Sequence, residues 1–528
     1  SVREQATGPK LNRWQKNAVS EIGKAIRERK HRVYLLYGVT GSGKTEIYIN
    51  LILKALEMDL GAIFLYPEIG LTPLYQERFN PRFPSLVLHS SLNPKLRRKN
   101  WHGLRKGLVR VGIGPRSAIF GPVPNLGIII VDEEHSTSYK EMFRSPYYHA
   151  REVAIARSRY ASCPVVLGSA TPSVETFHRA IIRDYQMIRL PRRIDQRKLP
   201  EVQTIDLKRE KRRVITNRLR EELLDTIARN EQAIIFINRK GYAPVVICPD
   251  CGKTVRCPDC GIPLVYYKRE AILRCNYCFH GERLPETCPN CHHKGLKMLG
   301  IGTERIEETL RKHFGDKVIR VDREKVRSDL ARIYTQFKSR DRLLMVGTTL
   351  VTKGHDFPNV TLVGVINGDQ VLNLPDFRSA EYTFQTLTQV AGRAGRGKRP
   401  GRVIVQTHQP NHPLFQSVRS HDYERFYHDE IMLRRELNYP PFCRLILIRL
   451  RGKRVDSVKK IGVEIKGNIP SRPGVSVYGP VPSFRRKIGK DYNFIMLIKV
   501  KGDHGWLKDY LKSKDPRVSV DVDPISTI

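Results

Sequence analysis

The feature that most constrains the fold is a G-x-x-x-x-G-K-T loop at residues 38–45. An apolar run at 33–37 leads into the loop and a helical pattern at 46–56 leaves it, which is the strand–loop–helix context that this motif requires. In that context, N–H groups at the start of the helix bind phosphates, Lys44 reaches the β- and γ-phosphates, and Thr45 ligates Mg²⁺. A chance glycine-rich turn is the alternative. We predict a site for ATP with Mg²⁺ built by these loop residues: Gly38, Thr40, Gly41, Ser42, Gly43, Lys44 and Thr45.

A second motif supports the same chemistry. The apolar run at 126–131 delivers Asp132 and Glu133 to the carboxyl end of a strand, where α/β proteins bind their ligands. We expect Asp132 to hold Mg²⁺ through its coordination shell and Glu133 to be the general base for the attacking water. The simpler alternative is an acidic cluster that starts a helix.

A third motif, Gln389-Val390-Ala391-Gly392-Arg393-Ala394-Gly395-Arg396, places two arginines on a glycine-rich turn. The planar guanidinium suits the charge that spreads over a transferring γ-phosphoryl group. We therefore count Gln389, Arg393 and Arg396 with Lys44, Asp132 and Glu133 as the candidate catalytic residues. Because the arginines lie far from Lys44 in the sequence, we expect them on a second lobe that closes on ATP.

The charge of the chain predicts a polyanionic partner. Its 528 residues include 93 Lys and Arg against 53 Asp and Glu, which gives a net charge of +40. That sign fits nucleic acid or an anionic membrane surface. No apolar run approaches the roughly 18 residues of a membrane span, and residues 1–10 have no signal-peptide core. We expect a soluble cytoplasmic protein, nucleoid-associated and without a membrane partner; the basic stretches 189–213 and 485–490 are either phosphate contacts or solvated linkers.

Eight of the ten cysteines form four C-x-x-C pairs, Cys248/Cys251, Cys257/Cys260, Cys275/Cys278 and Cys288/Cys291. Such pairs predict two closed Cys₄ zinc sites, while the alternative of disulfides is disfavoured in a reducing cytoplasm. The spacing favours a nested arrangement, with the second pair joining the third and the first joining the fourth, because sequential pairing leaves only residues 252–256 between the first two. We expect His280, His292 and His293 to be bystanders, and Cys163 and Cys443 to be ordinary buried thiols.

Apolar runs that alternate with helical patterns predict an α/β protein with several domains. Runs at 62–66, 128–131 and 165–167 predict a doubly wound parallel sheet, and a second set begins at 233–237. The cysteine block interrupts that second set, and we expect metal rather than an apolar core to hold the block together. We place the domains as follows: lobe one with the ATP site, 1–185; linker and start of lobe two, 186–246; Cys-rich two-zinc insertion, 247–297; remainder of lobe two, 298–410; C-terminal α+β domain, 411–528.

The C-terminal domain is expected to begin with an aromatic-rich helix at 423–437. Strands are expected at 445–450 and 494–500. In lobe two, further strands are expected at 318–321, 343–347, 363–366 and 403–407.

Taken together, these segments resemble a known family. The matching segments are 38–45, 132–135, 168–173, 238–244, the eight cysteines, 347–358 and 389–396. They resemble the PriA family (primosomal protein N′), the replication-restart helicases of bacteria, which belong to superfamily 2. The resemblance extends from Leu11 to beyond Phe442, and the cysteine insertion is its most specific part.

The resemblance implies two RecA-like lobes and an ATP-dependent 3′-to-5′ DNA helicase with two zinc ions in the nested pairing. It implies binding of stalled or abandoned replication forks, primosome assembly and reloading of the replicative helicase. The implied partners are single-stranded and forked DNA, the primosome proteins and single-stranded DNA-binding protein.

The resemblance also suggests roles for individual residues. Gln15 matches the glutamine that contacts adenine, and the aromatic segment 135–148 matches a loop that couples DNA binding to hydrolysis. Aromatic rings bind unpaired bases of any sequence, although these rings are alternatively part of the core. The candidate DNA contacts are Arg116, Tyr139, Phe143, Tyr147, Tyr148, Arg239, Thr348 and Arg485.

Two departures from the family pattern affect these expectations. Members of the family carry a 3′-end-binding domain and a winged helix ahead of the motor, whereas residue 1 here lies almost directly before lobe one. Trp14 stands where a small or acidic residue is expected before Gln15. Two other functions stay open on the motifs alone: another superfamily 2 translocase that acts on RNA or duplex DNA, and a non-catalytic zinc scaffold that binds DNA.

Overall fold

The chain forms two compact units, residues 1–198 and 199–528. The computed structural model describes residues 9–527 except 211–213, 238–244, 249, 252–254, 259–263, 268–271, 275–279, 300–302, 322–325, 349–356, 375, 503–504 and 512–514. None of the helices that it describes is both long and apolar enough to cross a membrane.

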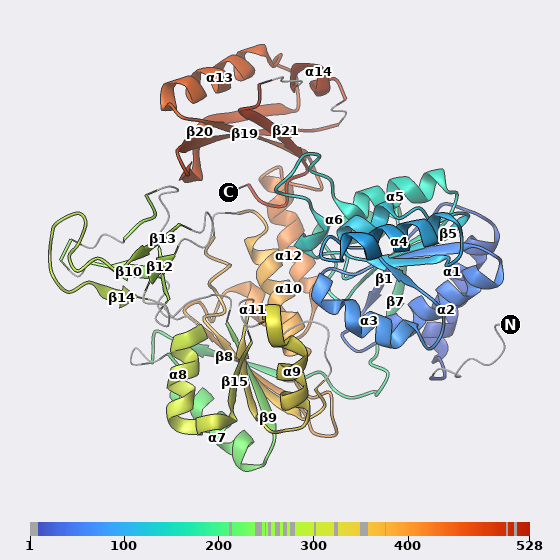
Figure 1. The fold of residues 1–528 in the computed structure, drawn as a ribbon, viewed down its shortest axis with the longest axis horizontal. Helices are drawn as coiled ribbons and strands as arrows, with labels where there is room; N and C mark the ends of the chain where they lie inside the picture. The colour runs from blue at the N-terminus through green and yellow to red at the C-terminus, as the bar shows by residue number, and fades with distance from the viewer. Residues whose placement is uncertain are drawn as a thin grey trace. The chain divides into compact units, whose positions relative to one another are not determined.

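The first unit is lobe one, a parallel sheet with helices on both faces (Figure 1). The sheet has the strand order β3-β4-β2-β5-β6-β1-β7. Its strands are β1 Val33–Gly38, β2 Gly61–Leu65, β3 Leu86–Val87, β4 Val111–Gly114, β5 Leu126–Asp132, β6 Val165–Ser169 and β7 Gln186–Leu190. Its helices are α1 Arg13–Arg27, α2 Lys44–Glu57, α3 Thr72–Phe79, α4 Pro94–Arg105, α5 Ala150–Tyr160 and α6 Val174–Ile181, with 3₁₀ turns at Ile69–Leu71, Arg116–Phe120 and Thr137–Tyr139.

Burial on both faces explains the sequence pattern of the central strands. Every residue of β2 and β5 is buried, so these strands are continuous apolar runs rather than alternating ones. Because all the strands are parallel, the carboxyl ends of β1, β5 and β6 meet at one edge of the sheet. The three segments that follow these ends are the phosphate loop, the 132–135 motif and the 168–173 segment.

Lobe two is a second parallel sheet, with the strand order β15-β16-β9-β17-β18-β8 in the described residues. Its strands are β8 Glu201–Asp206, β9 Gln232–Ile237, β15 Val318–Val321, β16 Leu344–Gly347, β17 Val360–Ile366 and β18 Arg402–Thr407. Its helices are α7 Asn217–Ala228, α8 Thr303–Phe314, α9 Val326–Lys338 and α10 Ser379–Ala391, with a 3₁₀ turn at Gly315–Lys317. The expected fold class of two parallel-sheet RecA-like lobes is confirmed.

The Cys-rich insertion lies between β9 and α8 and contains two small antiparallel sheets. One pairs β10 Val245–Ile247 with β14 Lys297–Leu299, and the other joins β11 Val265–Tyr267, β12 Ile272–Arg274 and β13 Gly281–Arg283. A small apolar core of Val246, Val255, Cys257, Leu264 and Leu273 supports them. The expectation that so short an insertion has no apolar core is therefore wrong.

The C-terminal part begins with two helices, α11 Pro413–Arg419 and α12 Tyr423–Glu436, that pack against α10 of lobe two. An antiparallel sheet in the order β20-β21-β19-β22 follows, backed by two helices. Its elements are β19 Arg444–Gly452, α13 Val455–Asn468, β20 Val475–Ile488, β21 Asp491–Val500, α14 Leu507–Leu511 and β22 Val518–Val522.

Strand pairing places three segments differently from the boundaries expected from sequence. β7 joins the sheet of lobe one, so that sheet extends beyond residue 185. The stretch expected as a basic linker contains β8, which pairs with β18 at the edge of lobe two. The helices α11 and α12 lie on lobe two rather than on the C-terminal sheet.

A buried ion-pair cluster fastens α12 to α10. The guanidinium of Arg434 bonds Glu381 Oε2 and Glu430 Oε1, both at 2.8 Å, and all three side chains are almost fully buried. Arg378 also reaches Glu381, at 3.2 Å. Phe384 of α10 stacks on Phe426 of α12 with ring centroids 4.5 Å apart.

This cluster predicts a large effect for one substitution. Arg434→Ala should lower the free energy of unfolding of the second unit by about 3 kcal/mol, because it removes the guanidinium that bonds both buried carboxylates, Glu381 and Glu430. Urea unfolding followed by circular dichroism measures the loss. The neighbouring Arg435→Ala is the control: Arg435 is exposed and only lies over the Phe442 ring, so it should cost less than about 1 kcal/mol. Equal losses in the two variants would show that the ion pairs add nothing to stability.

Candidate functional site

The phosphate loop joins β1 to α2 in a conformation that leaves the amino end of α2 open. Gly43 precedes the helix with φ of 79°, and no side chain caps the first turn. The uncapped N–H groups therefore point at the place where an anion binds. Lys44 Nζ lies over the loop and donates to Gly38 O at 2.9 Å.

Gln15 of α1 packs against the phosphate loop. Its side chain is buried and its Nε2 lies 3.3 Å from Ser42 O and 3.4 Å from Gly43 O. Gly43 has a φ of 79°, which favours glycine, and a Cβ there would lie 2.3 Å from that Nε2. Gln15 also forms a capping box with Asn12. The structure thus places Gln15 beside the loop, while the adjacent Trp14 is 46% exposed.

Asp132 ends β5 and is held by two tyrosines. Tyr48 OH of α2 donates to Oδ1 at 2.9 Å, and Tyr75 OH of α3 donates to Oδ2 at 2.5 Å. Burial, followed by repulsion from Glu133, raises the pKa of Asp132 to about 6. Each carboxylate oxygen keeps a second lone pair, so the group can still accept a hydrogen bond from water in a metal's coordination shell.

Glu133 is held in a strained backbone conformation. Its φ is 48°, which is uncommon for a residue other than glycine or asparagine. Its Oε2 is buried and accepts no hydrogen bond, and His135 Nδ1 lies 3.6 Å away. Strain and an unsatisfied acceptor are both typical of an active-site residue.

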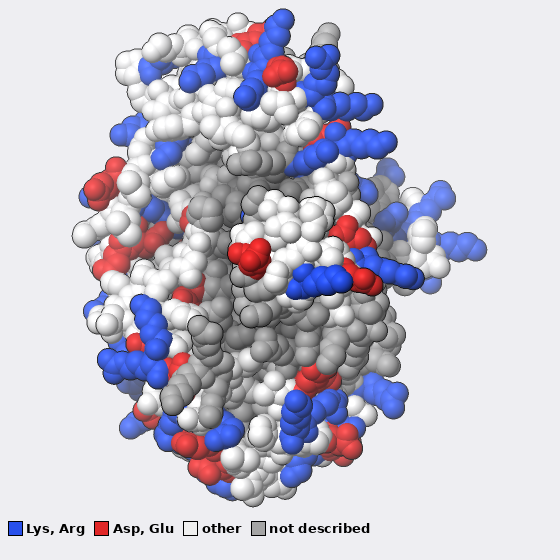
Figure 2. Space-filling model, turned by 90° about the vertical axis from the view of Figure 1, so that its left-hand side faces the viewer, with Lys and Arg blue, Asp and Glu red and all other residues white. Residues whose placement is uncertain are grey.

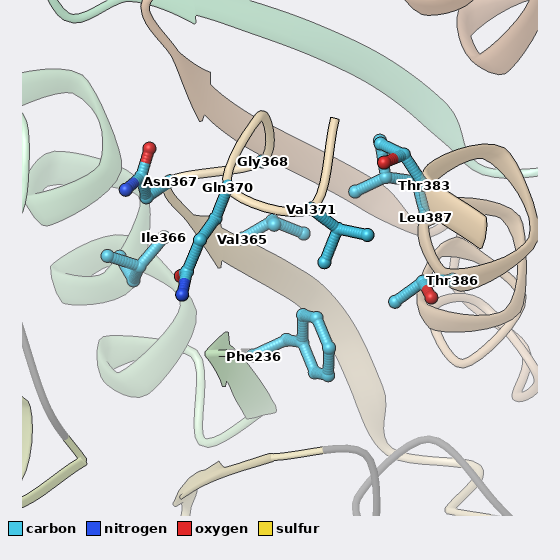
Figure 3. A pocket seen from close by; sticks show the side chains of 10 residues that line it. All are labelled: Phe236, Val365, Ile366, Asn367, Gly368, Gln370, Val371, Thr383, Thr386 and Leu387. Carbon is cyan, nitrogen blue, oxygen red and sulfur yellow. The ribbon is translucent and has the colours of Figure 1, made fainter. Parts of the chain in front are cut away.

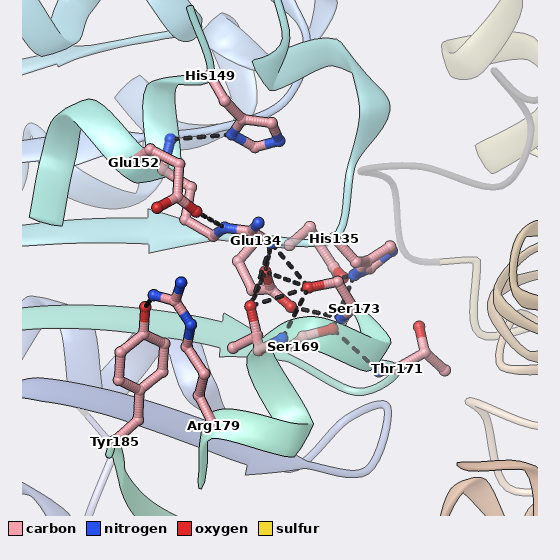
Figure 4. A network of polar contacts seen from close by, with 12 residues as sticks. Glu134, His135, His149, Glu152, Ser169, Thr171, Ser173, Arg179 and Tyr185 are labelled. Atoms are coloured by element: carbon pink, nitrogen blue, oxygen red, sulfur yellow. Dashed lines mark hydrogen bonds and ion pairs between the residues drawn. The ribbon is translucent and has the colours of Figure 1, made fainter. Parts of the chain in front are cut away.

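Glu134 is fully buried and joins the end of β5 to the segment after β6 (Figure 4). It accepts four hydrogen bonds: from Ser173 N at 2.7 Å, Ser173 Oγ at 3.2 Å, Thr176 Oγ1 at 3.0 Å and Arg151 Nη1 at 2.8 Å. His135 Nδ1 meets Ser169 Oγ at 2.7 Å. Glu134, His135, Ser169 and Ser173 belong to the sequence motifs but had no predicted role. Arg151 and Thr176 were not predicted from the sequence. A buried carboxylate was signalled only by its place directly after a buried strand.

The aromatic segment is closed at its base by contacts between charged groups and the backbone. Buried Lys140 donates to Tyr147 O at 3.0 Å, and Glu141 N donates to Tyr148 O at 2.8 Å. Arg116 donates to Lys140 O at 2.5 Å and pairs with Glu141 at 2.6 Å. Arg116 was expected to contact DNA phosphate. In the structure its guanidinium holds the backbone and the Glu141 carboxylate of the aromatic segment.

The aromatic residues of the segment have different surroundings. Tyr139 is fully buried and its OH donates to Asp132 O at 2.6 Å, so the expectation that it stacks on DNA bases is wrong. Phe143 is 83% exposed, whereas Tyr147 and Tyr148 are partly buried. Tyr148 packs edge-on against Phe120 at 5.1 Å. Only Phe143 offers an open ring face in this segment.

The third motif lies at the end of α10 in lobe two. Gln389 is in the last turn of the helix, and Arg393 and Arg396 follow on a turn in which Gly395 has φ of 67°. A Cβ on Gly395 would lie 2.5 Å from Gly401 N, so this turn requires glycine. Arg396 Nε donates to Gly392 O at 2.8 Å. Thr348 follows β16 and is buried; Arg239 and the side chain of Arg485 lie outside the described residues.

Lobe two also contains a small pocket between the ends of β9 and β17 and the helix α10 (Figure 3). Phe236, Val365 and Leu387 line it together with polar groups such as Gln370 and Thr383. Its lining holds no charged side chain.

Lys and Arg predominate over Asp and Glu on the face of the C-terminal domain at the top of Figure 2. Basic side chains are the groups that bind nucleic-acid phosphates. The expected surplus of exposed positive charge is thus visible on this domain.

Four cysteines of the insertion lie together, from the first and fourth C-x-x-C pairs. Their sulfur atoms are within 4.8 Å of one another: Cys248, Cys251, Cys288 and Cys291. Cys251 N and Asn290 N point at the sulfurs of Cys248 and Cys288, at 3.5 and 3.4 Å. This is the grouping that the nested arrangement predicts. Of the other four, only Cys257 lies within the described residues, and Cys260, Cys275 and Cys278 lie outside them.

The two remaining cysteines are buried thiols, as expected. Burial raises the pKa of Cys163 to about 12 and that of Cys443 to about 11. Neither is suited to thiolate chemistry at neutral pH.

Four family models match the chain. They are DEAD/DEAH box helicase over residues 12–180, helicase conserved C-terminal domain over 293–398, PriA DNA helicase Cys-rich region domain over 257–283, and Primosomal protein N C-terminal domain over 435–525.

Three curated relatives, each described as replication restart protein PriA, are similar over almost the whole chain. The Bacillus subtilis protein is 42% identical over 97% of this chain, and the Synechocystis protein is 40% identical over 93%. The chain covers 66% and 61% of those two proteins, which is less than two thirds of their length. The Chlamydia trachomatis protein is 37% identical over 98% of this chain, which covers 72% of that relative. The chain therefore belongs to the PriA family of replication restart proteins.

Proposed function

We propose that this chain is the motor of an ATP-dependent 3′-to-5′ DNA helicase that acts in replication restart. The observation that carries the proposal is the meeting of Lys44, Asp132 and a strained Glu133 at one edge of a parallel sheet. Membership of the PriA family supports forked DNA as the substrate. It also supports primosome proteins and single-stranded DNA-binding protein as partners, and reloading of the replicative helicase as the outcome.

The residues of lobe one suit the binding and hydrolysis of ATP. The open amino end of α2 and the ammonium of Lys44 would hold the phosphates, while Thr45 and Asp132 would hold Mg²⁺. Bound Mg²⁺ supplies charge neutralisation at the phosphates. Glu133 Oε2 accepts a proton from the attacking water in this proposal, because it follows Asp132 directly and has no competing hydrogen bond.

The arginines of lobe two complete the proposed mechanism. Arg393 and Arg396 lie on the turn after α10, and either guanidinium can stabilise the charge of the transferring phosphoryl group. Gln389 precedes them on the last turn of α10. In this proposal, closure of lobe two on the nucleotide brings the arginines to the phosphates and links hydrolysis to movement along DNA.

The buried contacts around Asp132 suggest how DNA binding is coupled to hydrolysis. Tyr139 OH holds the Asp132 carbonyl, and the next residue, Lys140, holds the far end of the aromatic segment. A base that stacks on Phe143 would therefore act on the backbone from which Glu133 projects. The proposed coupling predicts that a change at Phe143 affects both DNA binding and DNA-stimulated hydrolysis.

We also propose that the insertion binds two zinc ions. Zinc–sulfur bonds of about 2.3 Å in a tetrahedron place sulfurs about 3.8 Å apart. Cys248 and Cys291 have their sulfurs 3.5 Å apart, and Cys251 and Cys288 have theirs 3.7 Å apart, so this first site fits the ion. Cys257, Cys260, Cys275 and Cys278 are the proposed ligands of the second.

Glu133→Gln should lower the turnover of ATP by about 10²–10⁴-fold with little change in ATP affinity, because it removes the proton acceptor and keeps the side-chain shape. Steady-state hydrolysis with single-stranded DNA, duplex DNA and RNA as activators measures the loss and identifies the preferred polymer. Glu57→Gln is the control, since Glu57 is an exposed residue at the far end of α2. Turnover that persists in Glu133→Gln would remove Glu133 as the base, and stimulation only by RNA or duplex would indicate another class of translocase.

Phe143→Ala should weaken binding of single-stranded DNA by about 1–3 kcal/mol, the value of one stacked base. It should also lower DNA-stimulated hydrolysis more than basal hydrolysis. Tyr160→Ala is the matched control, because Tyr160 is 92% exposed at the end of α5 in the same lobe. Equal losses of basal and stimulated hydrolysis in Phe143→Ala would contradict the coupling role.

Elemental analysis of the purified chain should find two zinc ions, and Cys251→Ser should reduce the content to one. Basal hydrolysis should survive in that variant, because the insertion has its own small core, while unwinding should fall. Cys443→Ser is the control and should keep both ions. One ion in the unsubstituted chain would refute the two-site arrangement.

A further inference from the structure

A long stretch of lobe one carries positive charge without any acidic residue. Residues 78–131 contain ten Lys and Arg and no Asp or Glu. Six of the ten lie on or directly after α4: Lys95, Arg97, Arg98, Lys99, Arg105 and Lys106. The motor motifs account for none of these six.

Helix α4 is anchored by few residues, and it presents the basic side chains to solvent. It packs against β3 at the edge of the sheet. Asn100 and Leu104 are buried, and Asn100 Nδ2 donates to Val87 O at 2.9 Å. The exposed side chains of Lys95, Arg98, Lys99, Arg105 and Lys106 recur at helical spacing on the opposite side.

This basic face, defined by Lys95, Arg98, Lys99, Arg105 and Lys106, is not neutralised by neighbouring acids. Among the residues that the structure describes, none of the five forms an ion pair, whereas Arg82 and Arg110 nearby pair with Glu46 and Asp59. Arg105 instead lies over the ring of Trp101, 5.5 Å from its centroid.

The arrangement is unfavourable for the isolated helix. Like charges three and four residues apart repel one another, and Lys95 lies in the first turn, where the helix dipole disfavours a cation. No acidic residue in the first turn offsets this effect. A repelling row of cations on a rigid helix becomes favourable when a polyanion covers it.

We propose that the basic face of α4 binds the phosphate backbone of duplex DNA. The helix is 12 residues long, which corresponds to about 18 Å, and duplex DNA offers one charge per about 1.7 Å of its axis. A straight, rigid row of cations matches this dense and regular array. Sites for single strands combine a basic groove with aromatic rings on which bases stack, and the indole ring that α4 exposes, Trp101, already lies under Arg105.

The site lies in lobe one, beside the motor rather than within its motifs. In a parallel crossover, α4 starts near the carboxyl ends of the strands, where Asp132 lies, and runs back along the sheet edge. The inference rests on the proposed function, to which it adds a binding site for a duplex arm. Equilibrium duplex binding without ATP tests it separately from the motor.

The test compares the full chain with R98Q/K99Q/R105Q, in which glutamine keeps the helix propensity of the native residues. Binding of a blunt-ended duplex and of oligo(dT) of equal length is measured by fluorescence anisotropy over a salt series. The slope of log K against log salt for the duplex should fall by about 2 to 3, because each phosphate contact contributes about 0.9. Oligo(dT) affinity and oligo(dT)-stimulated hydrolysis should stay within about twofold, since stacking dominates there.

The matched control is K24Q/R27Q/K30Q, which removes three exposed positive charges at the end of α1 and just beyond it in the same lobe. Acids are present there, since Glu28 pairs with Lys24 and Lys30. The control should keep the full duplex slope.

Four results would overturn the proposal. One is an unchanged duplex slope in R98Q/K99Q/R105Q with native circular dichroism. Another is an equal loss in the α1 control, which would reduce the effect to net charge. The third is an equal loss for oligo(dT), which would assign the face to single strands. The fourth is tight binding of a polyglutamate peptide that disappears in R98Q/K99Q/R105Q, which would assign the face to an acidic protein tail.

Discussion

The buried carboxylate of Glu134 holds together the edge of lobe one on which the candidate site depends. A fully buried charge is tolerated only when it is paired and hydrogen-bonded, and Glu134 finds these partners on α5, on α6 and in the segment after β6. The ends of β5 and β6 are therefore joined by side chains as well as by strand pairing. The contacts of Glu134 therefore also position Asp132 and Glu133, which directly precede it in the sequence.

The same edge is reinforced from the other side by tyrosines. Tyr48 and Tyr75 bond the Asp132 side chain, and Tyr139 bonds its carbonyl. Tyrosine rings from α2, α3 and the 3₁₀ turn after β5 thus pack around Asp132. This explains how Glu133 is kept at a positive φ, because the residues on both sides of it are fixed.

The second unit uses different means to join its parts. Buried ion pairs fasten α12 to α10, and the chain end adds to the connection through Ser526 Oγ, which donates to Asp376 at 2.8 Å, and Tyr382 OH, which donates to Ile525 O at 2.7 Å. The insertion combines a small apolar core with a set of four cysteines. Neither arrangement needs the long apolar runs that form the two parallel sheets, which is why local patterns revealed them less clearly.

The sequence by itself determined the class of fold and the residues at the sheet edge. Continuous apolar runs mark buried parallel strands, and the loop at 38–45 and the acids at 132–133 follow such runs directly. Cysteine spacing determined the grouping of Cys248 and Cys251 with Cys288 and Cys291. Only the tertiary structure decided that Tyr139 is core, that Arg116 clamps the aromatic segment, and that β7 and β8 complete the two sheets. The physical reason is that burial and pairing depend on elements distant in sequence, so identical aromatic or basic residues have different roles according to what packs against them.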